Sequence, residues 1–224
     1  MEVEDLSPVA QDYLKVIWSA EEWGEAPITT TGLAERFSTT RANVSATLRR
    51  LADQGLVDYE PYRRAALTGL GRRLAIAMVR RHRLIEAFLA QTLHYQPEEV
   101  HGEAEHLEHA VSERFLERID ALLGHPVTDP HGDPIPDADG RWARQPASAM
   151  VAAVSAGRYR VARIADADPA LLARLIAAGI RPGADVRVEA DGRRIVGEHH
   201  MVDLEAFERA AVRVFRVPIE DSSL

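Results

Sequence analysis

The sequence predicts a mainly α-helical protein with small β regions, arranged as a winged helix-turn-helix, a helical middle domain and a small C-terminal β-barrel. Three observations predict this fold class. Short helical patterns are followed by two strands around a basic turn, long amphipathic helices come next, and alternating strand patterns fill the last third. The expected domains are residues 1–74, 75–145 and 150–224.

The composition sets broad limits on function. The chain has 224 residues, 46% of them hydrophobic, which is enough to bury more than one core. No apolar run reaches the roughly 18 residues of a membrane span, and the acidic N-terminus does not resemble a signal peptide. We therefore expect a cytoplasmic protein with no membrane partner. The absence of cysteine excludes disulfides, zinc-finger cages and a thiol nucleophile.

The N-terminal third carries the pattern of a winged DNA-binding module. A first helix is predicted in "SPVAQDYLKVIWSAEEWG", where apolar residues recur at helical spacing after a Ser-Pro start. Two shorter helices follow in "ITTTGLAERFS" and "TTRANVSATLRRLADQGLV", with a tight break near Ser38 and Thr39. The segment "GLVDYEPYRRAALTGLGRRL" then predicts two strands and the start of a further helix. The plainer alternative is a helical hairpin without a DNA-binding role.

The charge distribution favours DNA binding by this part of the chain. The net charge is −8, but eleven arginines stand against three acidic residues between Arg36 and Arg83, a local balance of +8 that leaves −16 elsewhere (−8 minus 8). The alternative is that these arginines cover a solvent-exposed helix surface and do not bind DNA. In a winged module the recognition helix presents outward residues to base edges, and the wing contacts phosphate. The expected DNA-binding residues are Thr40, Arg41, Ala42, Asn43 and Thr47 on the helix and Arg63 and Arg64 on the wing.

The middle of the chain predicts a dimer core followed by a tether. Residues 74–93 and 100–124 read as two long amphipathic helices, which suit a dimer that reads two half-sites. Residues 124–148 are rich in Pro, Gly and Asp and lack periodicity, so we expect an extended tether. We expect its prolines to disperse four residues that would otherwise suggest a metal site: His125, Asp129, His131 and Asp133.

The last third predicts a small β-barrel without catalytic machinery. Alternating patterns in "YRVARI", "DVRVEA", "RRIVGE" and "AVRVFRV" indicate strands, and "PALLARLIAAG" indicates a helix. No nucleophile with a base, phosphate loop or aromatic stacking platform is recognisable there. We therefore expect a protein that is not an enzyme.

Imidazole and carboxylate side chains gather at helical spacing downstream of the winged module. Positions three and four apart on a helix share a face, so two sets can converge. A donor set without sulfur suits a fairly hard divalent ion. One helical Glu or His is usually only a solvated residue, so the metal interpretation rests on the whole set. Its members are His82 and Glu86 in one helix and His101, Glu105, Glu108 and His109 in the next.

These ordered motifs resemble, over essentially the whole length, the diphtheria-toxin-repressor family of metal-dependent transcription regulators. "DYLKVIW" is similar to the family's first helix, "LAERFSTTRANVSATLRRLADQGLV" to its helix-turn-helix and "LTGLGRRLA" to the exit of its wing. "RRHRLIEAFL", "VHGEAEHLEHAVSE" and "HPVTDPHGDPIP" resemble its metal-binding and dimerisation segment, and "AAGIRPGADVRV" its SH3-like C-terminal domain. The resemblance implies a homodimer that binds operator DNA when it is loaded with metal.

The resemblance also implies two metal sites. The primary site falls on Asp12, Glu105, Glu108 and His109, and the second on His82, Glu86 and His101 with Asp168 as the best candidate from the C-terminal domain. Iron-type members place Met and Cys where this chain has Asp12 and Glu105, so the resemblance is to the manganese-responsive, three-domain type. Leu171 stands where iron-type relatives offer an amide, which puts the contribution of the C-terminal domain in doubt.

The function expected from the sequence is a Mn²⁺-dependent repressor of metal-uptake genes. An oxygen-rich site suits Mn²⁺, whereas sulfur and additional nitrogen favour Fe²⁺, Co²⁺ or Zn²⁺. Two alternatives stay open at this point. One is an Fe²⁺-dependent repressor of iron-uptake genes, and the other is a hydrolytic metal centre that activates water.

Overall fold

The computed structural model describes residues 1–24, 28–60, 64–189 and 192–217, and these residues form two compact units. The first unit contains residues 1–81 and 136–141, and the second contains residues 82–135 and 142–224 as far as they are described. The division falls inside a long helix, between Arg81 and His82. No helix among the described residues is long and apolar enough to cross a membrane.

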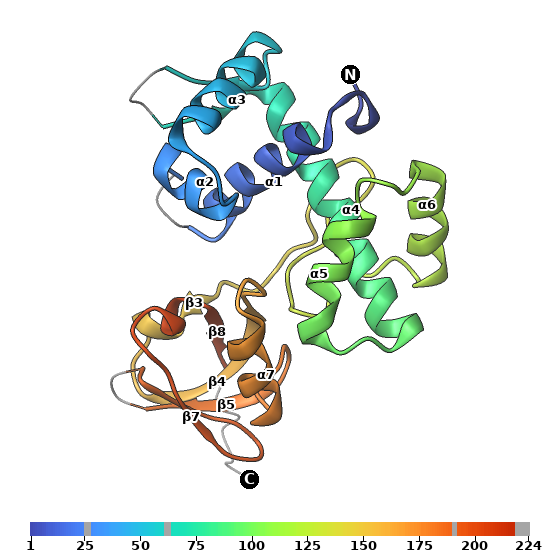
Figure 1. The fold of residues 1–224 in the computed structure, drawn as a ribbon. Coiled ribbons are helices and arrows are strands. Elements are labelled where there is room, and N and C mark those ends of the chain that lie inside the picture. The colour runs from blue at the N-terminus through green and yellow to red at the C-terminus, as the bar shows by residue number, and fades with distance from the viewer. Residues whose placement is uncertain (25–27, 61–63, 190–191, 218–224) are drawn as a thin grey trace. The chain divides into compact units, whose positions relative to one another are not determined.

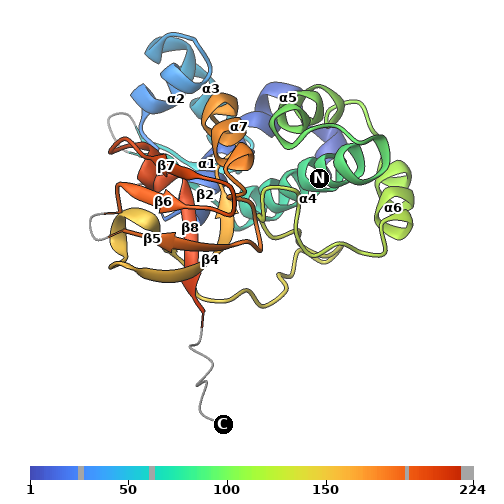
Figure 2. The same cartoon turned by 90° about the horizontal axis from the view of Figure 1, so that it is seen from below.

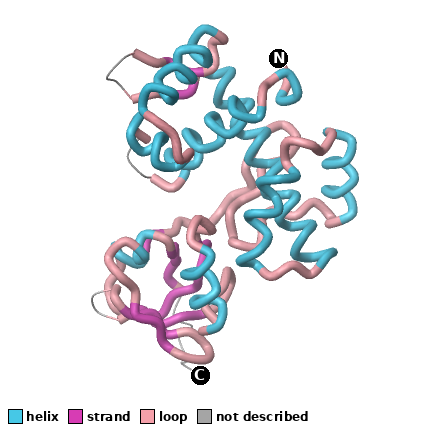
Figure 3. The backbone as a smooth tube through the Cα atoms, in the orientation of Figure 1, coloured by secondary structure: helices cyan, strands magenta, loops and turns pink. Residues whose placement is uncertain are grey.

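The described helices and strands follow the predicted order of a helical N-terminal two thirds and a β-rich C-terminal third (Figures 1 and 3). The α-helices are α1 (Pro8–Glu22), α2 (Thr30–Arg36), α3 (Arg41–Asp53), α4 (Gly69–Leu93), α5 (Pro97–Leu107), α6 (Glu113–Leu122) and α7 (Pro169–Ala177). The strands are β1 (Val57–Asp58), β2 (Ala66–Leu67), β3 (Ala149–Met150), β4 (Gly157–Ile164), β5 (Asp185–Val188), β6 (Arg194–Val196), β7 (Met201–Asp203) and β8 (Val212–Arg216).

The helix-turn-helix forms because each of its helices begins at a hydroxyl cap. The side chains of Thr29 and Thr40 accept hydrogen bonds from backbone N–H groups in the first turns of α2 and α3. Ser38 adopts a left-handed conformation, with φ of 47°, in the turn between the two helices. Strands β1 and β2 pair antiparallel and form the wing. The predicted winged module is therefore confirmed.

One predicted helix of the middle domain is two helices in the structure. Residues 100–124 were expected to continue as a single helix, but α5 ends at Leu107 and α6 begins at Glu113. The Ser112 hydroxyl caps α6 by accepting a hydrogen bond from the Phe115 amide, so the chain restarts there. Apolar side chains then fill small cores with α4, formed by Ile85, Leu89, Val100, Ala104 and Leu116 on one side and by Leu84, Ala87, Ile119 and Ile135 on another.

The C-terminal part is one antiparallel sheet with a helix packed against it (Figure 2). Its strand order is β3-β8-β4-β5-β6-β7. Leu171, Leu172 and Leu175 of α7 are buried in the same core as Val161 and Ile164 of β4. On its other side α7 contacts α5. The predicted SH3-like domain is thus confirmed, and the sheet has a short strand at each edge, β3 and β7, that was not predicted.

Residues 128–134 form a tight turn, which contradicts the expected extended tether. The Asp129 amide donates to the Asp133 carbonyl at 3.0 Å, and the Gly132 amide donates to the Asp129 carbonyl at 3.2 Å. Gly132 has φ of +86°, and a Cβ there would lie 2.3 Å from the Ala162 carbonyl oxygen, so this turn packs directly on β4. Pro130 lies inside this turn, so the prolines do not spread these residues along an extended chain.

Candidate metal centre

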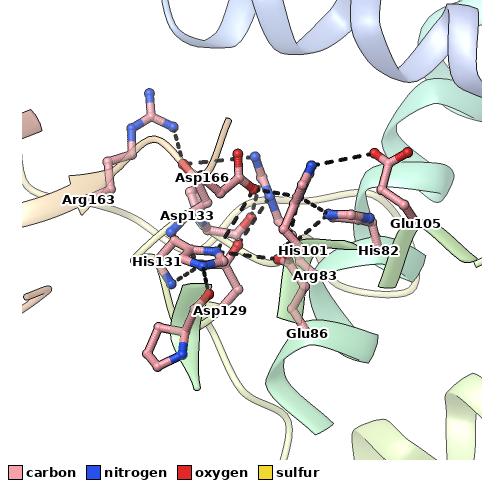
Figure 4. Close-up of polar contacts among 12 residues, drawn as sticks. His82, Arg83, Glu86, His101, Glu105, Asp129, His131, Asp133, Arg163 and Asp166 are labelled. Carbon is pink, nitrogen blue, oxygen red and sulfur yellow. Dashed lines mark hydrogen bonds and ion pairs between the residues drawn. The ribbon is translucent and has the colours of Figure 1, made fainter. Parts of the chain in front are cut away.

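The buried polar centre of the second unit is built on α4 and α5 (Figure 4). His82 and Glu86 lie one turn apart on α4, and His101 lies on α5. Glu86 Oε1 is 3.0 Å from His82 Nε2 and 3.4 Å from His101 Nδ1. The Glu86 side chain has no exposed surface. Helical spacing accounts for the proximity of His82 and Glu86, and the packing of α5 against α4 adds His101.

The turn after α6 adds Asp129 and His131 to this centre. The His131 side chain is fully buried, and its Nδ1 faces Glu86 Oε2 at 3.8 Å. Its Nε2 lies 2.9 Å from the Pro97 carbonyl oxygen, which fixes the ring. Asp129 Oδ1 accepts two backbone N–H groups, from His131 and Asp133, at 2.9 Å each.

The sequence-based prediction rejected Asp129 and His131 as ligands because of the neighbouring prolines, although a signal for a turn was present. Asp129, Pro130 and Gly132 occupy the positions of a type I turn that favour Asp, Pro and Gly. Such a turn brings Asp129 and His131 to the same end of the loop, instead of spacing them along an extended chain.

The C-terminal domain contributes Asp166, and not Asp168. Asp166 Oδ2 lies 2.9 Å from His101 Nδ1 and 3.9 Å from His131 Nδ1. Asp168 is exposed and caps α7, where its Oδ1 accepts the amides of Ala170 and Leu171 at 3.0 Å each. The choice of Asp168 is therefore corrected, because its side chain is engaged by the helix that follows it. Leu171 is buried in the hydrophobic core of the C-terminal domain.

Opposite charges dominate the electrostatics of this centre. Burial opposes ionisation of Glu86, but His82, His101 and His131 hold its pKa well below the usual range. Burial opposes protonation of His101, but Asp166 and Glu86 raise its pKa to about 10. Burial likewise opposes protonation of His131, yet Glu86, Asp129 and Asp166 raise its pKa to about 10. The metal-free centre therefore keeps protons on His101 and His131, whereas burial and the nearby carboxylates of Asp133 and Glu86 raise the pKa of Asp129.

The residues of this centre fit a divalent cation. Glu86 Oε2 and His131 Nδ1 are both buried and make no hydrogen bond, and they face one another. Buried polar atoms without a hydrogen bond are uncommon, and a bound cation is one of the reasons for them. Ligand atoms of Glu86, Asp129 and His131 lie within 4.8 Å of one another, as do those of His82, Glu86, His101 and Asp166. The donors are oxygen and imidazole nitrogen, as hard divalent ions prefer.

Another group of candidate ligands, which includes residues of the primary site implied by the resemblance, lies at the end of α5. Ligand atoms of His82, Glu105 and Glu108 lie within 4.8 Å of one another. His82 Nδ1 is 2.5 Å from Glu108 Oε2, and His109 Nε2 is 3.6 Å from Glu108 Oε1. Glu108 is fully buried at the C-cap of α5. His82 therefore contacts both groups. Asp12 lies partly buried on α1, in the first unit.

The start of α3 presents most of the expected DNA-binding residues to solvent. Thr40 caps the helix, and Arg41, Ala42 and Asn43 are exposed in its first turn. The expectation that Thr47 faces outward is wrong.

Thr47 is only 8% exposed, and its hydroxyl accepts a hydrogen bond from Arg50 Nη2 at 3.1 Å. Thr47 lies beside the buried Tyr13 of α1. Arg64 is exposed between β1 and β2, and Arg63 lies outside the described residues.

A winged module joined to a buried carboxylate and imidazole centre defines the class of metal-dependent DNA-binding regulators. The comparisons with known proteins agree. Residues 5–65 match the N-terminal DNA binding domain of iron dependent repressors, residues 68–137 match their metal binding and dimerisation domain, and residues 152–197 match the FeoA domain. The chain belongs to the iron-dependent repressor family, which includes the diphtheria toxin repressor.

Individual relatives share most of the chain's length. The iron-dependent repressor IdeR of Mycobacterium leprae is 33% identical over 96% of this chain and 100% of its own. The diphtheria toxin repressor of Corynebacterium efficiens is 33% identical over 96% and 98%. Among solved structures, a manganese-dependent transcriptional repressor in complex with manganese is 46% identical, with a TM-score of 0.84 over 93% of this chain and 100% of that one. The manganese regulator SloR is 29% identical, with a TM-score of 0.79 over 95% and 100%.

Proposed function

We propose that this protein is a cytoplasmic, homodimeric, Mn²⁺-dependent repressor that binds operator DNA when it is metal-loaded and represses metal-uptake genes. The observation that carries the proposal is the donor set of the centre, which consists of carboxylates and imidazoles alone. Such a set suits Mn²⁺, but raw affinity follows the Irving–Williams order, so the choice of Mn²⁺ depends on the ligand type, the coordination geometry and the available concentration of each ion. A structural relative at 46% identity is named as manganese-dependent, which supports the same ion.

Two ions are proposed for each chain. Asp12, Glu105, Glu108 and His109 hold the first, as the family resemblance implies. The second is held by Glu86, His101, Asp129, His131 and Asp166, and His82 lies between the two groups. Each bound ion supplies the positive charge that lets carboxylates from separate segments come together.

The proposed coupling to DNA follows from where the first group of ligands lies in the chain. Asp12 is on the helix that also carries Tyr13, and Tyr13 contacts the helix-turn-helix. A metal that holds Asp12 therefore fixes α1 and, through it, α3, so that binding of metal and binding of operator strengthen one another. On the DNA side, we propose that Thr40, Arg41, Ala42 and Asn43 lie near base edges and that Arg63 and Arg64 contact phosphate.

An anaerobic titration tests the proposal. Mn²⁺, Fe²⁺ and Zn²⁺ are added separately to the apo-protein with its own upstream DNA, and operator binding is followed by fluorescence anisotropy. We expect tight binding at micromolar Mn²⁺ and weak binding with Fe²⁺. Asp12→Ala and Glu108→Ala should each abolish the Mn²⁺ response while the dimer stays folded. DNA binding that ignores every metal, or an intact response in both variants, contradicts the proposal.

Fe²⁺ is the second candidate ion. The specific observation in its favour is that curated relatives with 33% to 35% identity carry the name iron-dependent repressor. An equal response to Fe²⁺ and Mn²⁺ in the anaerobic titration would favour an iron-dependent repressor of iron-uptake genes.

A further inference from the structure

A buried ion-pair network lies beside the second group of metal ligands, and none of its arginines is itself a ligand (Figure 4). Arg163 of β4 donates from Nη1 to Asp133 Oδ1 at 2.7 Å. Arg83 of α4 lies on the other side, with Nη2 at 3.9 Å from the same oxygen. All three side chains are nearly buried. Asp133 therefore lies between two guanidinium groups of different domains.

Arg83 is shared between the carboxylates of Asp129 and Asp133. Its Nε lies 3.7 Å from Asp129 Oδ2 and its Nη2 lies 3.9 Å from Asp133 Oδ1, so both contacts are ion pairs longer than a hydrogen bond. Its Nη1 donates to the Pro134 carbonyl at 2.7 Å, and its guanidinium lies 5.9 Å from the centre of the Trp142 ring. Without Asp133, Asp129 would be the remaining carboxylate of this pair beside Arg83.

Arg83 approaches Oδ2 of Asp129, whereas the turn engages Oδ1. Oδ1 accepts two backbone N–H groups of the turn, and Oδ2 lies 3.7 Å from Arg83 Nε. A guanidinium that bonded to Oδ2 would neutralise the carboxylate and compete with a cation for it. Asp129 can therefore serve as a ligand more readily when another carboxylate pairs with Arg83.

We propose that Asp133 is a positioning residue of the second metal group, because its carboxylate balances Arg83 and Arg163 and so leaves Asp129 available to the ion. The inference rests on the proposed function and assigns a role to a residue outside the ligand set. Partners of this kind typically change metal affinity by about 10- to 100-fold when they are altered. The turn itself has other anchors, since the Ile164 amide donates to the His131 carbonyl at 2.9 Å.

Two variants break the ion pair between Arg163 and Asp133, one from each side. They distinguish a role of Asp133 in keeping Asp129 available from a role in anchoring the turn to β4. Asp133→Asn removes the charge that balances Arg83, so we expect the second Mn²⁺ binding step to weaken by at least about tenfold. Arg163→Gln removes the same 2.7 Å contact but leaves the Asp133 carboxylate beside Arg83, so the affinity should stay within about threefold of wild type. Asp185→Asn, which breaks an exposed Arg160 pair, is the surface control.

The measurement is calorimetric titration of Mn²⁺ into each full-length apo-protein, with thermal unfolding of the same samples. Adding Arg83→Gln to Asp133→Asn should restore the Mn²⁺ affinity, because the competing guanidinium is gone.

Equal weakening by Asp133→Asn and Arg163→Gln would mean that the ion pair only anchors the turn, and would overturn the inference. If Asp133→Asn does not fold, the Mn²⁺ affinity of Arg163→Gln is the deciding measurement. Weakened Mn²⁺ binding by Arg163→Gln would then mean that the ion pair anchors the turn, and would overturn the inference. A wild-type chain that binds no Mn²⁺ overturns the proposed function as well, whereas normal binding by Asp133→Asn overturns this inference alone.

Discussion

Asp166 and Asp168 show how strongly the surroundings decide what a carboxylate does. They are two positions apart and chemically identical, yet Asp166 faces two imidazoles and Asp168 caps a helix. The sequence could not separate them, because the separation depends on where α7 begins, and helix boundaries are uncertain by a residue or two. The pattern Asp-Pro at the start of a helix was nevertheless a usable signal for a cap at Asp168.

The two aspartates should respond differently to replacement by alanine. Asp166→Ala should weaken Mn²⁺ binding by about 10- to 100-fold, because the ion loses a ligand. Asp168→Ala should leave Mn²⁺ affinity unchanged and lower the free energy of unfolding by about 1 kcal/mol, because α7 loses its cap. Calorimetry and chemical denaturation measure the two effects, and the reverse assignment would contradict the proposed ligand set.

Metal binding should release protons from the buried imidazoles. His101 and His131, with pKa values raised to about 10, hold protons at neutral pH in the metal-free protein, and an imidazole must lose its proton to coordinate an ion. For each proton released, Mn²⁺ affinity should rise about tenfold per pH unit between pH 6 and 8.

Calorimetry in two buffers of different ionisation enthalpy measures the number of protons released. His125→Gln is the control, because His125 is exposed and pairs with Asp120 away from the centre. Heats that do not depend on the buffer would show that neither imidazole gives up a proton to the ion.

Among the structural elements, the turn at residues 129–132 differs most from the prediction, which was an extended tether. The capped helices and the wing were predictable, because their signals are local: a hydroxyl at the N-cap, helical periodicity and alternation. The turn has a local signal as well, but its burial against β4 does not, because β4 lies about 30 positions further along the chain. For the same reason the sequence could not show that Thr47 faces α1.

The tight approach at Gly132 predicts a large effect of a single methyl group. Gly132→Ala places a Cβ 2.3 Å from the Ala162 carbonyl oxygen, so the backbone must shift. We expect a loss of about 3 kcal/mol in the free energy of unfolding, together with weaker binding of the second Mn²⁺. Gly183→Ala is the matched control, since Gly183 also has positive φ but no atom within 4 Å of the added carbon, and it should cost only about 1 kcal/mol.

In the proposed coupling, Tyr13 of α1 links the metal to the helix-turn-helix. Tyr13 stacks on Phe37 at the end of α2, with ring centroids 4.4 Å apart. Tyr13→Leu should weaken Mn²⁺-dependent operator binding by about fivefold, because the aromatic stack is lost, without a change in Mn²⁺ stoichiometry. Tyr159→Leu replaces a buried tyrosine of the C-terminal domain and should leave operator affinity unchanged. Equal effects of the two variants on operator affinity would refute the link.

Across the whole molecule, the positive charge is concentrated in the stretch that contains the winged module. The remainder of the chain carries about twice as much negative charge. Attraction to DNA is therefore confined to one region, and the acidic remainder opposes nonspecific binding elsewhere.

The salt dependence of operator binding should show that the phosphate contacts come from the winged module. Arg64→Ala should reduce the slope of log affinity against log salt concentration by about one, because one phosphate contact is lost. Arg160→Ala removes an exposed arginine of β4 and should leave the slope as it is. An unchanged slope for Arg64→Ala would mean that this residue does not touch phosphate.

The buried centre has a further consequence for a chain that contains no cysteine. Its candidate ligands come from positions 86, 101, 129, 131 and 166, so an ion held there ties together segments up to 80 positions apart (166 minus 86). In chain-entropy terms a closed loop of this size removes about 4 kcal/mol of freedom from the unfolded ensemble, as much as a disulfide across the same span. Unlike a disulfide, such a cross-link would exist only while the ion is bound, so we expect the free energy of unfolding to rise with the concentration of free metal.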